Sequence, residues 1–167
     1  MKIGIDIDET LTDTAKSFRY INKKYNICTD KNFKSRWSEE EILKYSKYLS
    51  EMFKGAKLKK GAKEAMDELH KLGHKLYIIT ARNNKYCAQV EDLTINMLRE
   101  NNLYFDEIYF NQQLKSDIAK ELGIGLMIDD SLSVYNNMKS ENIECIMFGK
   151  DVKSWREVLE YINKVGE

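Results

Sequence analysis

The chain has 167 residues, of which 43% are hydrophobic, so it is long enough for one domain with a core and an insertion. Its 27 basic and 27 acidic residues cancel, and we therefore expect neither a nucleic acid polymer nor a membrane surface as its partner. No apolar stretch approaches the roughly 20 residues of a membrane span, no leader pattern precedes the first apolar run, and three widely spaced cysteines favour reduced thiols, so we expect a cytoplasmic protein.

The first third of the chain predicts one strand followed by helices only. The expected elements are a strand over 2–8 and helices over 14–25, 38–55 and 61–72. Apolar side chains recur every three or four residues in each helix, and Ser38 and Glu41 form a capping box at the start of the second. Because no strand pattern interrupts residues 13–57, we expect this segment to form a small helical cap inserted into a core of residues 1–12 and 58–167.

From Gly61 onwards, strand and helix patterns alternate. The expected strands cover 75–80, 108–110, 125–129 and 143–148, and the expected helices cover 84–101, 116–122, 131–140 and 154–165. Short β-branched runs such as KLYIIT indicate the strands, and the helical spacing of apolar residues indicates the helices. This alternation predicts an α/β fold, a Rossmann-like parallel sheet in three layers.

Polar side chains stand where the predicted strands end. Carboxylates and a hydroxyl end three of the strands, namely Asp6, Asp8, Thr80, Asp129 and Asp130, and Lys115 follows a fourth. In an open parallel sheet, ligands bind beyond the carboxyl ends of the strands. We therefore expect these six side chains to meet at one rim of the sheet.

The residue types at this rim predict a magnesium-dependent phosphate site. Four neighbouring carboxylates repel one another unless a cation lies among them, and oxygen donors without cysteine or histidine favour Mg²⁺. Lys115 and Thr80 can hold phosphate oxygens, and helix N-termini after Thr80 and Asp130 add backbone donors. Taken singly, Thr80 could be an ordinary strand residue and Lys115 a solvated side chain. Asp129, Asp130 or Ser131 could each cap the helix that follows.

Four motifs carry a resemblance to a known superfamily. DIDET, IITAR, the lone Lys115 and MIDDS follow one another as in the haloacid dehalogenase superfamily of phosphotransferases, which the chain resembles over its whole length. Within it, the sequence is similar to the cytosolic type C 5′-nucleotidases, the 5′(3′)-deoxyribonucleotidase family, through KLKKGAKEAMDELHKLGHKLYIITAR, YFDEIYF and LMIDDS. The resemblance implies a Mg²⁺-dependent phosphomonoesterase with a HAD-like core. Its substrate would be a small phosphorylated molecule, first of all a (deoxy)nucleoside 5′-monophosphate.

The resemblance also implies catalytic roles for the matching residues. Asp6 would attack phosphorus and become an aspartyl phosphate. Asp8 would protonate the leaving oxygen and later deprotonate the hydrolytic water. Thr80 would hold the phosphoryl group through its hydroxyl, and Lys115 would neutralise the charge of Asp6 and of the phosphate.

The implied ligands of Mg²⁺ are all oxygens. They are the Asp6 carboxylate, the Asp8 backbone carbonyl and the Asp130 carboxylate, with Asp129 acting through a water molecule. Glu9 stands where most members of the superfamily have glycine, and it adds a negative charge beside this site.

Further substrate contacts are expected from the second motif and from the cap. Ala81 and Arg82 directly follow the second predicted strand. Arg82 either faces the leaving group or bridges to an acid of the cap. Trp37 either touches the substrate or packs as a staple ahead of the next helix.

Two other functions are open at this point. The rim would serve equally a phosphatase for another small phosphoester, such as a sugar phosphate, because the cap sequence does not decide the leaving group. It would also serve a sensor that binds a phosphate or nucleotide without turnover, or that accepts a phosphoryl group on Asp6, although a pure receiver has no need of Asp8. The oligomeric state is open as well, with a homodimer as one option.

Overall fold

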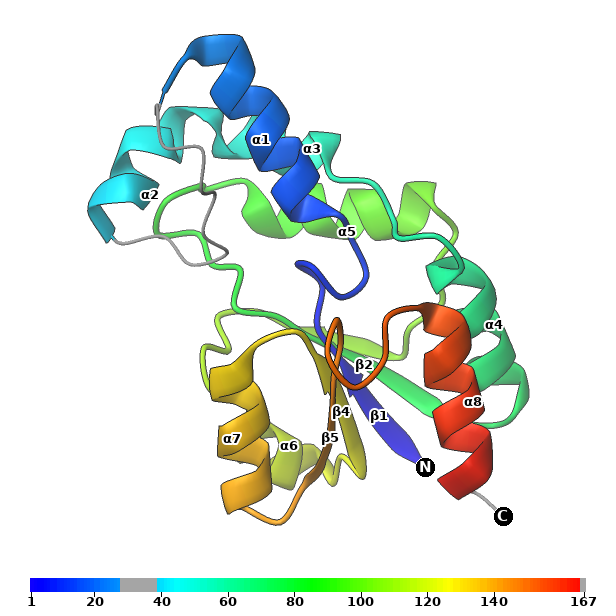
Figure 1. Ribbon diagram of the computed structural model, residues 1–167. Helices are drawn as coiled ribbons and strands as arrows, with labels where there is room; N and C mark the ends of the chain where they lie inside the picture. Colours follow the sequence, from blue (N-terminus) through cyan, green and yellow to red (C-terminus); the bar gives the residue numbers. More distant parts are fainter. Residues whose placement is uncertain (28–38, 166–167) are drawn as a thin grey trace.

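Five parallel strands form the central sheet. The computed structural model describes residues 1–27 and 39–165 (Figure 1). The strands are β1 (Lys2–Ile5), β2 (Lys75–Ile79), β3 (Glu107–Tyr109), β4 (Leu126–Asp129) and β5 (Glu144–Met147), in the order β3-β2-β1-β4-β5. Every neighbouring pair is parallel, so the predicted α/β fold is confirmed.

The strand β1 lies in the middle of the sheet and is covered on both faces. Ile3 and Ile5 are fully buried on one face of the sheet. Gly4 faces the side chains that pack on the other face. A Cβ atom on Gly4 would lie 2.7 Å from Sδ of Met127, so a larger residue has no room in this close approach. Pairing with β2 on one side and β4 on the other fixes where β1 ends, and therefore where Asp6 leaves the sheet.

Helices cover both faces of the sheet and give three layers (Figure 1). One face is covered by α4 (Ala62–Lys71) and α8 (Trp155–Val165), the other by α6 (Ser116–Leu122) and α7 (Leu132–Ser140). Trp155 on α8 is fully buried, and its indole N–H donates a hydrogen bond to the Thr10 carbonyl oxygen at 3.0 Å. This bond ties α8 to the loop that follows β1.

The remaining helices gather beyond the carboxyl ends of the strands (Figure 1). They are α1 (Thr14–Tyr25), α2 (Glu39–Tyr45), the 3₁₀-helix η1 (Ser46–Tyr48), α3 (Leu49–Gly55) and α5 (Val90–Glu100). An apolar cluster that includes Ile21, Met52 and Val90 packs α1 and α3 against α5. The helices inserted after β1 therefore rest on chain that follows β2. Within the described ranges, no helix is long and apolar enough to cross a membrane.

The first strand is shorter than predicted. The expected strand over 2–8 ends at Ile5, although the Asp6 N–H continues the ladder by donating to the Ile128 carbonyl oxygen at 3.0 Å. Beyond it, the backbone N–H groups of residues 10–12 all donate to the Ile7 carbonyl oxygen. Three donors on one carbonyl fold the chain into a tight turn, which ends the strand and turns the second carboxylate away from the sheet.

Two predicted helices also differ from those observed. The helix expected over 84–101 begins at Val90, because the Asn83 side chain accepts a hydrogen bond from the Lys85 N–H at 3.0 Å and favours a turn. The helix expected over 38–55 is divided into α2, η1 and α3.

A side-chain hydrogen bond accompanies this division. Ser46 Oγ donates to the Leu43 carbonyl oxygen at 2.8 Å, which competes with regular helical bonding at that point. Ser38, the first residue of the predicted capping box, lies outside the described residues.

Candidate active site

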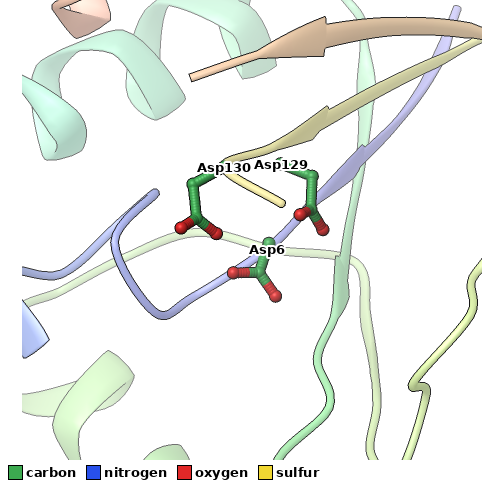
Figure 2. A group of neighbouring side chains, drawn as sticks. All are labelled: Asp6, Asp129 and Asp130. Atoms are coloured by element: carbon green, nitrogen blue, oxygen red, sulfur yellow. The ribbon is translucent and has the colours of Figure 1, made fainter. Parts of the chain in front are cut away.

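The loops after β1 and β4 bring predicted carboxylates together. From β1 the chain continues to β2 and β3 on one side of the sheet and then returns to β4 and β5 on the other. The switch between these directions lies at β1 and β4, and such switch points are where open α/β sheets bind ligands. Asp6 follows β1, and Asp129 and Asp130 stand at the end of β4 beside it (Figure 2).

A buried lysine joins two of these carboxylates. Lys115 stands at the start of α6, and its Nζ lies 2.5 Å from Asp6 Oδ1 and 2.6 Å from Asp129 Oδ2. Its side chain is only 2% exposed. Burial would lower the pKa of Lys115, but the charges of Asp6 and Asp129 outweigh burial and raise that pKa. The ammonium therefore stays charged, and the alternative of a solvated lysine is wrong.

Negative charge exceeds positive charge around this lysine. Burial raises the pKa of Asp6 well above its usual value, and Asp129 raises it further against the effect of Lys115. Burial also raises the pKa of Asp130 to about 7, and the charges of Asp129 and Glu9 add to this. A bound cation would relieve the repulsion that these raised pKa values record.

The donor set fits a small cation with oxygen ligands. Asp6, Asp129 and Asp130 each offer a carboxylate oxygen, and these oxygens lie within 4.8 Å of one another (Figure 2). Both oxygens of Asp129 already have partners, Lys115 Nζ and, at 2.8 Å, the Ser131 N–H. Asp130 accepts no hydrogen bond from the part of the chain that the structure describes. Asp6 and Asp130 are therefore the carboxylates best placed to touch Mg²⁺ directly.

Asp8 is held by an arginine and a threonine. Arg82 Nε lies 2.9 Å from Asp8 Oδ2, and Arg82 Nη2 lies 2.7 Å from Asp8 Oδ1. Thr14, at the start of α1, donates its hydroxyl to Oδ1 at 2.6 Å. Burial would raise the pKa of Asp8, but the charge of Arg82 and these hydrogen bonds together lower it. The carboxyl is therefore ionised at neutral pH.

The predicted residues after β2 lie at the same rim. Because β1 and β2 are paired along the whole of β1, Asp6 and Thr80 leave neighbouring strands. Thr80 is fully buried, and its hydroxyl oxygen accepts a hydrogen bond from the Arg82 backbone N–H at 3.2 Å. The carbonyl oxygen of Ala81 accepts one from Gln113 Nε2, also at 3.2 Å. The loop after β2 is thus fixed by bonds to itself and to the loop before α6.

A pocket of about 350 Å³ opens beside Asp8, between α1, α3 and the loop after β2. Its lining is mostly apolar and includes the rings of Phe18, Phe53 and Tyr86. The Arg82 guanidinium stacks on Phe53, 4.3 Å from the ring centre. A group bound in this pocket would therefore lie next to the Asp8 carboxylate.

The chain is similar over nearly its whole length to several named proteins, although no family model matches it. It is 25% identical over 188 residues to "Putative nucleotidase YqfW" of Bacillus subtilis, a match that covers 98% of this chain and 94% of the relative. A HAD family hydrolase from Deinococcus radiodurans, with bound phosphate and sodium, superposes with a TM-score of 0.69 at 13% identity, over 99% of this chain and 96% of that one. A "predicted phosphatase" from Clostridium acetobutylicum superposes with a TM-score of 0.67 at 20% identity, over 98% of both chains. The protein has the fold of the haloacid dehalogenase (HAD) superfamily.

Within this HAD fold, the predicted rim residues fall into two groups. The first consists of Asp6, Lys115, Asp129 and Asp130, and the second of Asp8, Thr80, Ala81 and Arg82. Arg82 bridges to Asp8 rather than to an acid of the inserted helices. Ser131 is the residue that precedes α7 as its N-cap, so the two acids before it are not the cap. Trp37 lies outside the described residues.

Sequence reasoning missed the two threonines that hold the second group. Thr14 donates to Asp8, and Thr94 on α5 accepts a hydrogen bond from Arg82 Nη1 at 2.9 Å. Neither residue carries a sequence signal of its own, because Thr14 stands at a predicted helix start and Thr94 inside a helical pattern. Phe53 is predicted only as part of an apolar helix face, and that pattern does not tell which ring lies over an arginine.

Proposed function

We propose that this protein is a Mg²⁺-dependent phosphomonoesterase that forms an aspartyl phosphate on Asp6 and acts on (deoxy)nucleoside 5′-monophosphates. The observation that carries the proposal is the buried Lys115 ammonium between Asp6 and Asp129. Beside them lies the Asp130 carboxylate, which accepts no hydrogen bond from the described residues. Phosphoryl transfer depends on positioning and on charge neutralisation, and this arrangement can supply both.

In the first step, Asp6 attacks phosphorus, the bond from phosphorus to the leaving oxygen breaks, and the phosphoryl group stays on the Asp6 carboxylate. Lys115 keeps a positive charge beside Asp6, which lowers the repulsion between the carboxylate and the phosphate. Thr80 holds the phosphoryl group through its hydroxyl. The leaving oxygen takes a proton from Asp8, whose protonated form is favoured by the negative charge of the bound phosphate.

In the second step, Asp8 acts as a base. It takes a proton from water, the water oxygen attacks phosphorus, and the bond from phosphorus to Asp6 breaks. The products are inorganic phosphate, a free Asp6 carboxylate and an Asp8 that has regained its proton. The ion pair with Arg82 keeps Asp8 ionised in the free protein, which suits the role of a base.

Mg²⁺ would be held by the carboxylates of Asp6 and Asp130 and by the backbone carbonyl of Asp8, with Asp129 acting through a water molecule. Bound there, the ion would polarise the phosphoryl oxygens and screen the repulsion between phosphate and carboxylate. The raised pKa of Asp130 and its lack of a hydrogen-bond partner among the described residues support a direct contact.

The pocket beside Asp8 supports a nucleoside as the leaving group. Phe18, Phe53 and Tyr86 offer flat apolar surfaces on which a base can stack, and Asn83 and Gln113 add amide groups to the lining. A sugar without a base would leave most of this apolar surface uncovered. The nucleotidase name of the B. subtilis relative and the resemblance to type C 5′-nucleotidases agree with this choice.

Residues 13–57 would act as a cap over the leaving group, and residues 1–12 and 58–167 as the catalytic core. The pocket draws its walls from both parts, with Phe18 and Leu49 from the cap. A cap in this place would exclude water from the reacting groups and contact the part of the substrate that leaves.

A panel of phosphoesters assayed for phosphate release with Mg²⁺ tests the proposal. It pairs ribo- and deoxynucleoside 5′-monophosphates with pentose and hexose phosphates. We expect the nucleotides to turn over faster, with activity abolished by EDTA and by Asp6→Asn. The matched surface variant Asp67→Asn on α4, whose partner is Lys63, should leave activity unchanged.

Each part of the proposal can fail separately in this panel. Equal turnover of sugar phosphates would contradict the substrate class. Turnover near the wild-type rate in Asp6→Asn would remove Asp6 from the role of nucleophile. Nucleotide binding without phosphate release in the wild-type protein would indicate a sensor.

A further inference from the structure

Arg82 and Asp8 form a forked ion pair at the edge of the pocket. Two nitrogens of one guanidinium face both oxygens of one carboxylate, at 2.9 Å for Nε to Oδ2 and 2.7 Å for Nη2 to Oδ1. This arrangement fixes the direction of the carboxylate as well as its distance, which a lysine could not do. The Arg82 side chain is 2% exposed and the Asp8 side chain 34%, so the carboxylate is the part of the pair that faces open space.

Arg82 is itself fixed from several sides. Its Nη1 donates to Thr94 Oγ1 at 2.9 Å, and the Thr94 hydroxyl donates its own proton to the Val90 carbonyl oxygen at 2.6 Å. Phe53 covers one face of the guanidinium, and the Arg82 backbone N–H bonds to Thr80 Oγ1. Because the Thr94 proton is committed to Val90, its oxygen faces Arg82 as an acceptor. The arginine therefore cannot turn without leaving a buried donor unsatisfied.

Asp8 is thereby held in one orientation. Its Oδ1 accepts hydrogen bonds from Thr14 and from Arg82, whereas within the described chain its Oδ2 accepts one from Arg82 alone. A carboxylate oxygen has two lone pairs, so Oδ2 keeps one acceptor position. Since Asp8 lines the pocket, that position is open to the oxygen of a bound leaving group or to a water molecule.

We propose that Arg82 is a positioning residue for proton transfer by Asp8, turning the carboxylate so that Oδ2 meets the leaving oxygen. The inference rests on the proposed phosphomonoesterase function. In the step it serves, the proton passes from Asp8 Oδ2 to the leaving oxygen as the bond from that oxygen to phosphorus breaks. Each guanidinium nitrogen donates a hydrogen bond within the protein, and the side chain is 2% exposed, so we expect Arg82 to act through Asp8 and not on the phosphate.

This role predicts a dependence on the leaving group. An alkyl phosphate such as a nucleoside 5′-monophosphate needs a proton on its leaving oxygen, whereas p-nitrophenyl phosphate releases a stable anion and does not. The rate at which the leaving group is released in the first turnover reports on this step alone, before the aspartyl phosphate is hydrolysed. Loss of the positioning contact should therefore slow the first turnover of one ester and spare the other.

The experiment measures the rate of first-turnover release from both esters in four single variants and one double variant. Arg82→Gln should lose about 10²-fold with the nucleotide, within the range of general acid–base catalysis, and less than about 3-fold with the nitrophenyl ester. The half-saturating concentrations should stay within about 3-fold of wild type. Among the described residues, the Thr94 hydroxyl bonds to Arg82 and Val90 and not to Asp8, so Thr94→Val should show a smaller loss with the same selectivity. Asp8→Asn gives the largest loss that we expect. Arg156 lies on α8 with 88% of its side chain exposed, so Arg156→Gln should change neither rate.

Several results would overturn the positioning role. Equal losses with both esters are expected of a general structural defect, and a rise of the half-saturating concentration with both is expected of direct phosphate binding. The double variant Asp8→Asn/Arg82→Gln should be no slower than Asp8→Asn alone, and a further loss would also contradict the inference. Because the asparagine and the glutamine are both neutral, the double variant leaves no buried charge without a partner. It therefore provides the test if Arg82→Gln alone does not fold.

Failure of the inference and failure of the proposed function look different. A selective loss in Asp8→Asn without one in Arg82→Gln would refute the inference alone. A wild-type protein that turns over neither ester, or an Asp8→Asn variant that keeps its rate with the nucleotide, would refute the proposed function instead.

Discussion

Asp130→Asn should stabilise the metal-free protein, and increasingly so as the pH rises. Burial, with the charges of Asp129 and Glu9, raises the pKa of Asp130 from 3.8 to about 7 in the folded protein. A carboxyl group with a raised pKa binds its proton more tightly in the folded state, so stability is greatest at low pH and falls as the pH rises between the unfolded and the folded pKa. Asparagine has no acidic proton to lose, so the variant does not lose stability in this way as the pH rises.

The size of the effect follows from the shift in the pKa of Asp130. Each pKa unit corresponds to about 1.4 kcal/mol, so the shift from 3.8 to about 7 limits the effect to about 4 kcal/mol above neutral pH. The side chain is partly exposed, and screening by water reduces this limit. We expect the variant to gain about 2–3 kcal/mol over wild type at pH 8, and about 1 kcal/mol or less at pH 5.

Urea unfolding at the two pH values, in EDTA and in about 10 mM Mg²⁺, measures the difference between Asp130→Asn and wild type. Mg²⁺ should stabilise the wild type by binding to the folded state and should stabilise the variant less, because the variant has lost a direct ligand. A stability difference in EDTA that does not change with pH would refute the electrostatic reasoning. An equal gain from Mg²⁺ in both proteins would refute the assignment of Asp130 as a ligand.

Two further substitutions test other charged side chains by urea unfolding. Lys115→Met leaves Asp6 and Asp129 without their cation, and in EDTA it should cost about 3–5 kcal/mol, as breaking a buried ion pair does; a loss below about 1 kcal/mol would contradict this. Asp106→Ala removes the acceptor of the Leu76 N–H and should cost about 1–3 kcal/mol at neutral pH. Burial would raise the pKa of Asp106, but its hydrogen bonds lower it, so its contribution is present above the unfolded pKa and is lost as the pH falls through the folded one. The difference in the free energy of unfolding between Asp106→Ala and wild type should therefore become smaller in acid. A difference that does not change with pH would contradict this reasoning.

The sequence predicts the first group of site residues because a simple rule places them. Strands of a parallel sheet all end at one rim, so Asp6 and Asp129 meet whatever the details of the helices around them. Lys115 follows from the same rule, since it begins the helix after the third strand along the chain. What the rule does not give is burial, and it is burial that forces Lys115 to pair with both acids.

The residues of the second group are predicted as well, but the way they bond to one another could not be, because it depends on which of several partners a long side chain reaches. Arg82 can extend to the leaving group, to an acid of the inserted helices or back to Asp8, and nothing in IITAR separates these. The direction of the Arg82 side chain is decided by Thr94 on α5 and Phe53 on α3, which both contact it. These two residues come together around Arg82 only when the two helices pack against each other. Helical spacing reports which face of each helix is apolar, and it says nothing about the contact between two such faces.

Glu9 has a role that its charge alone would not suggest. Its φ of 60° lies in the left-handed region, which explains a preference for glycine at this position and costs another residue roughly 1–2 kcal/mol. Its Oε1 accepts a hydrogen bond from the Ala15 N–H at 2.6 Å, and its Oε2 lies 3.6 Å from Lys59 Nζ. Ala15 lies in the first turn of α1, and Lys59 lies in the connection from α3 to α4. The same connection is also joined to the loop after β1 by the bond from the Lys59 N–H to the Leu11 carbonyl oxygen at 2.8 Å. The carboxylate thus contacts both the start of the inserted helices and the segment that follows them, and these contacts offset the backbone strain. Because its charge also raises the pKa of Asp130, a glutamate here would strengthen the attraction for the proposed Mg²⁺, which would in turn attract the phosphate of the proposed substrate.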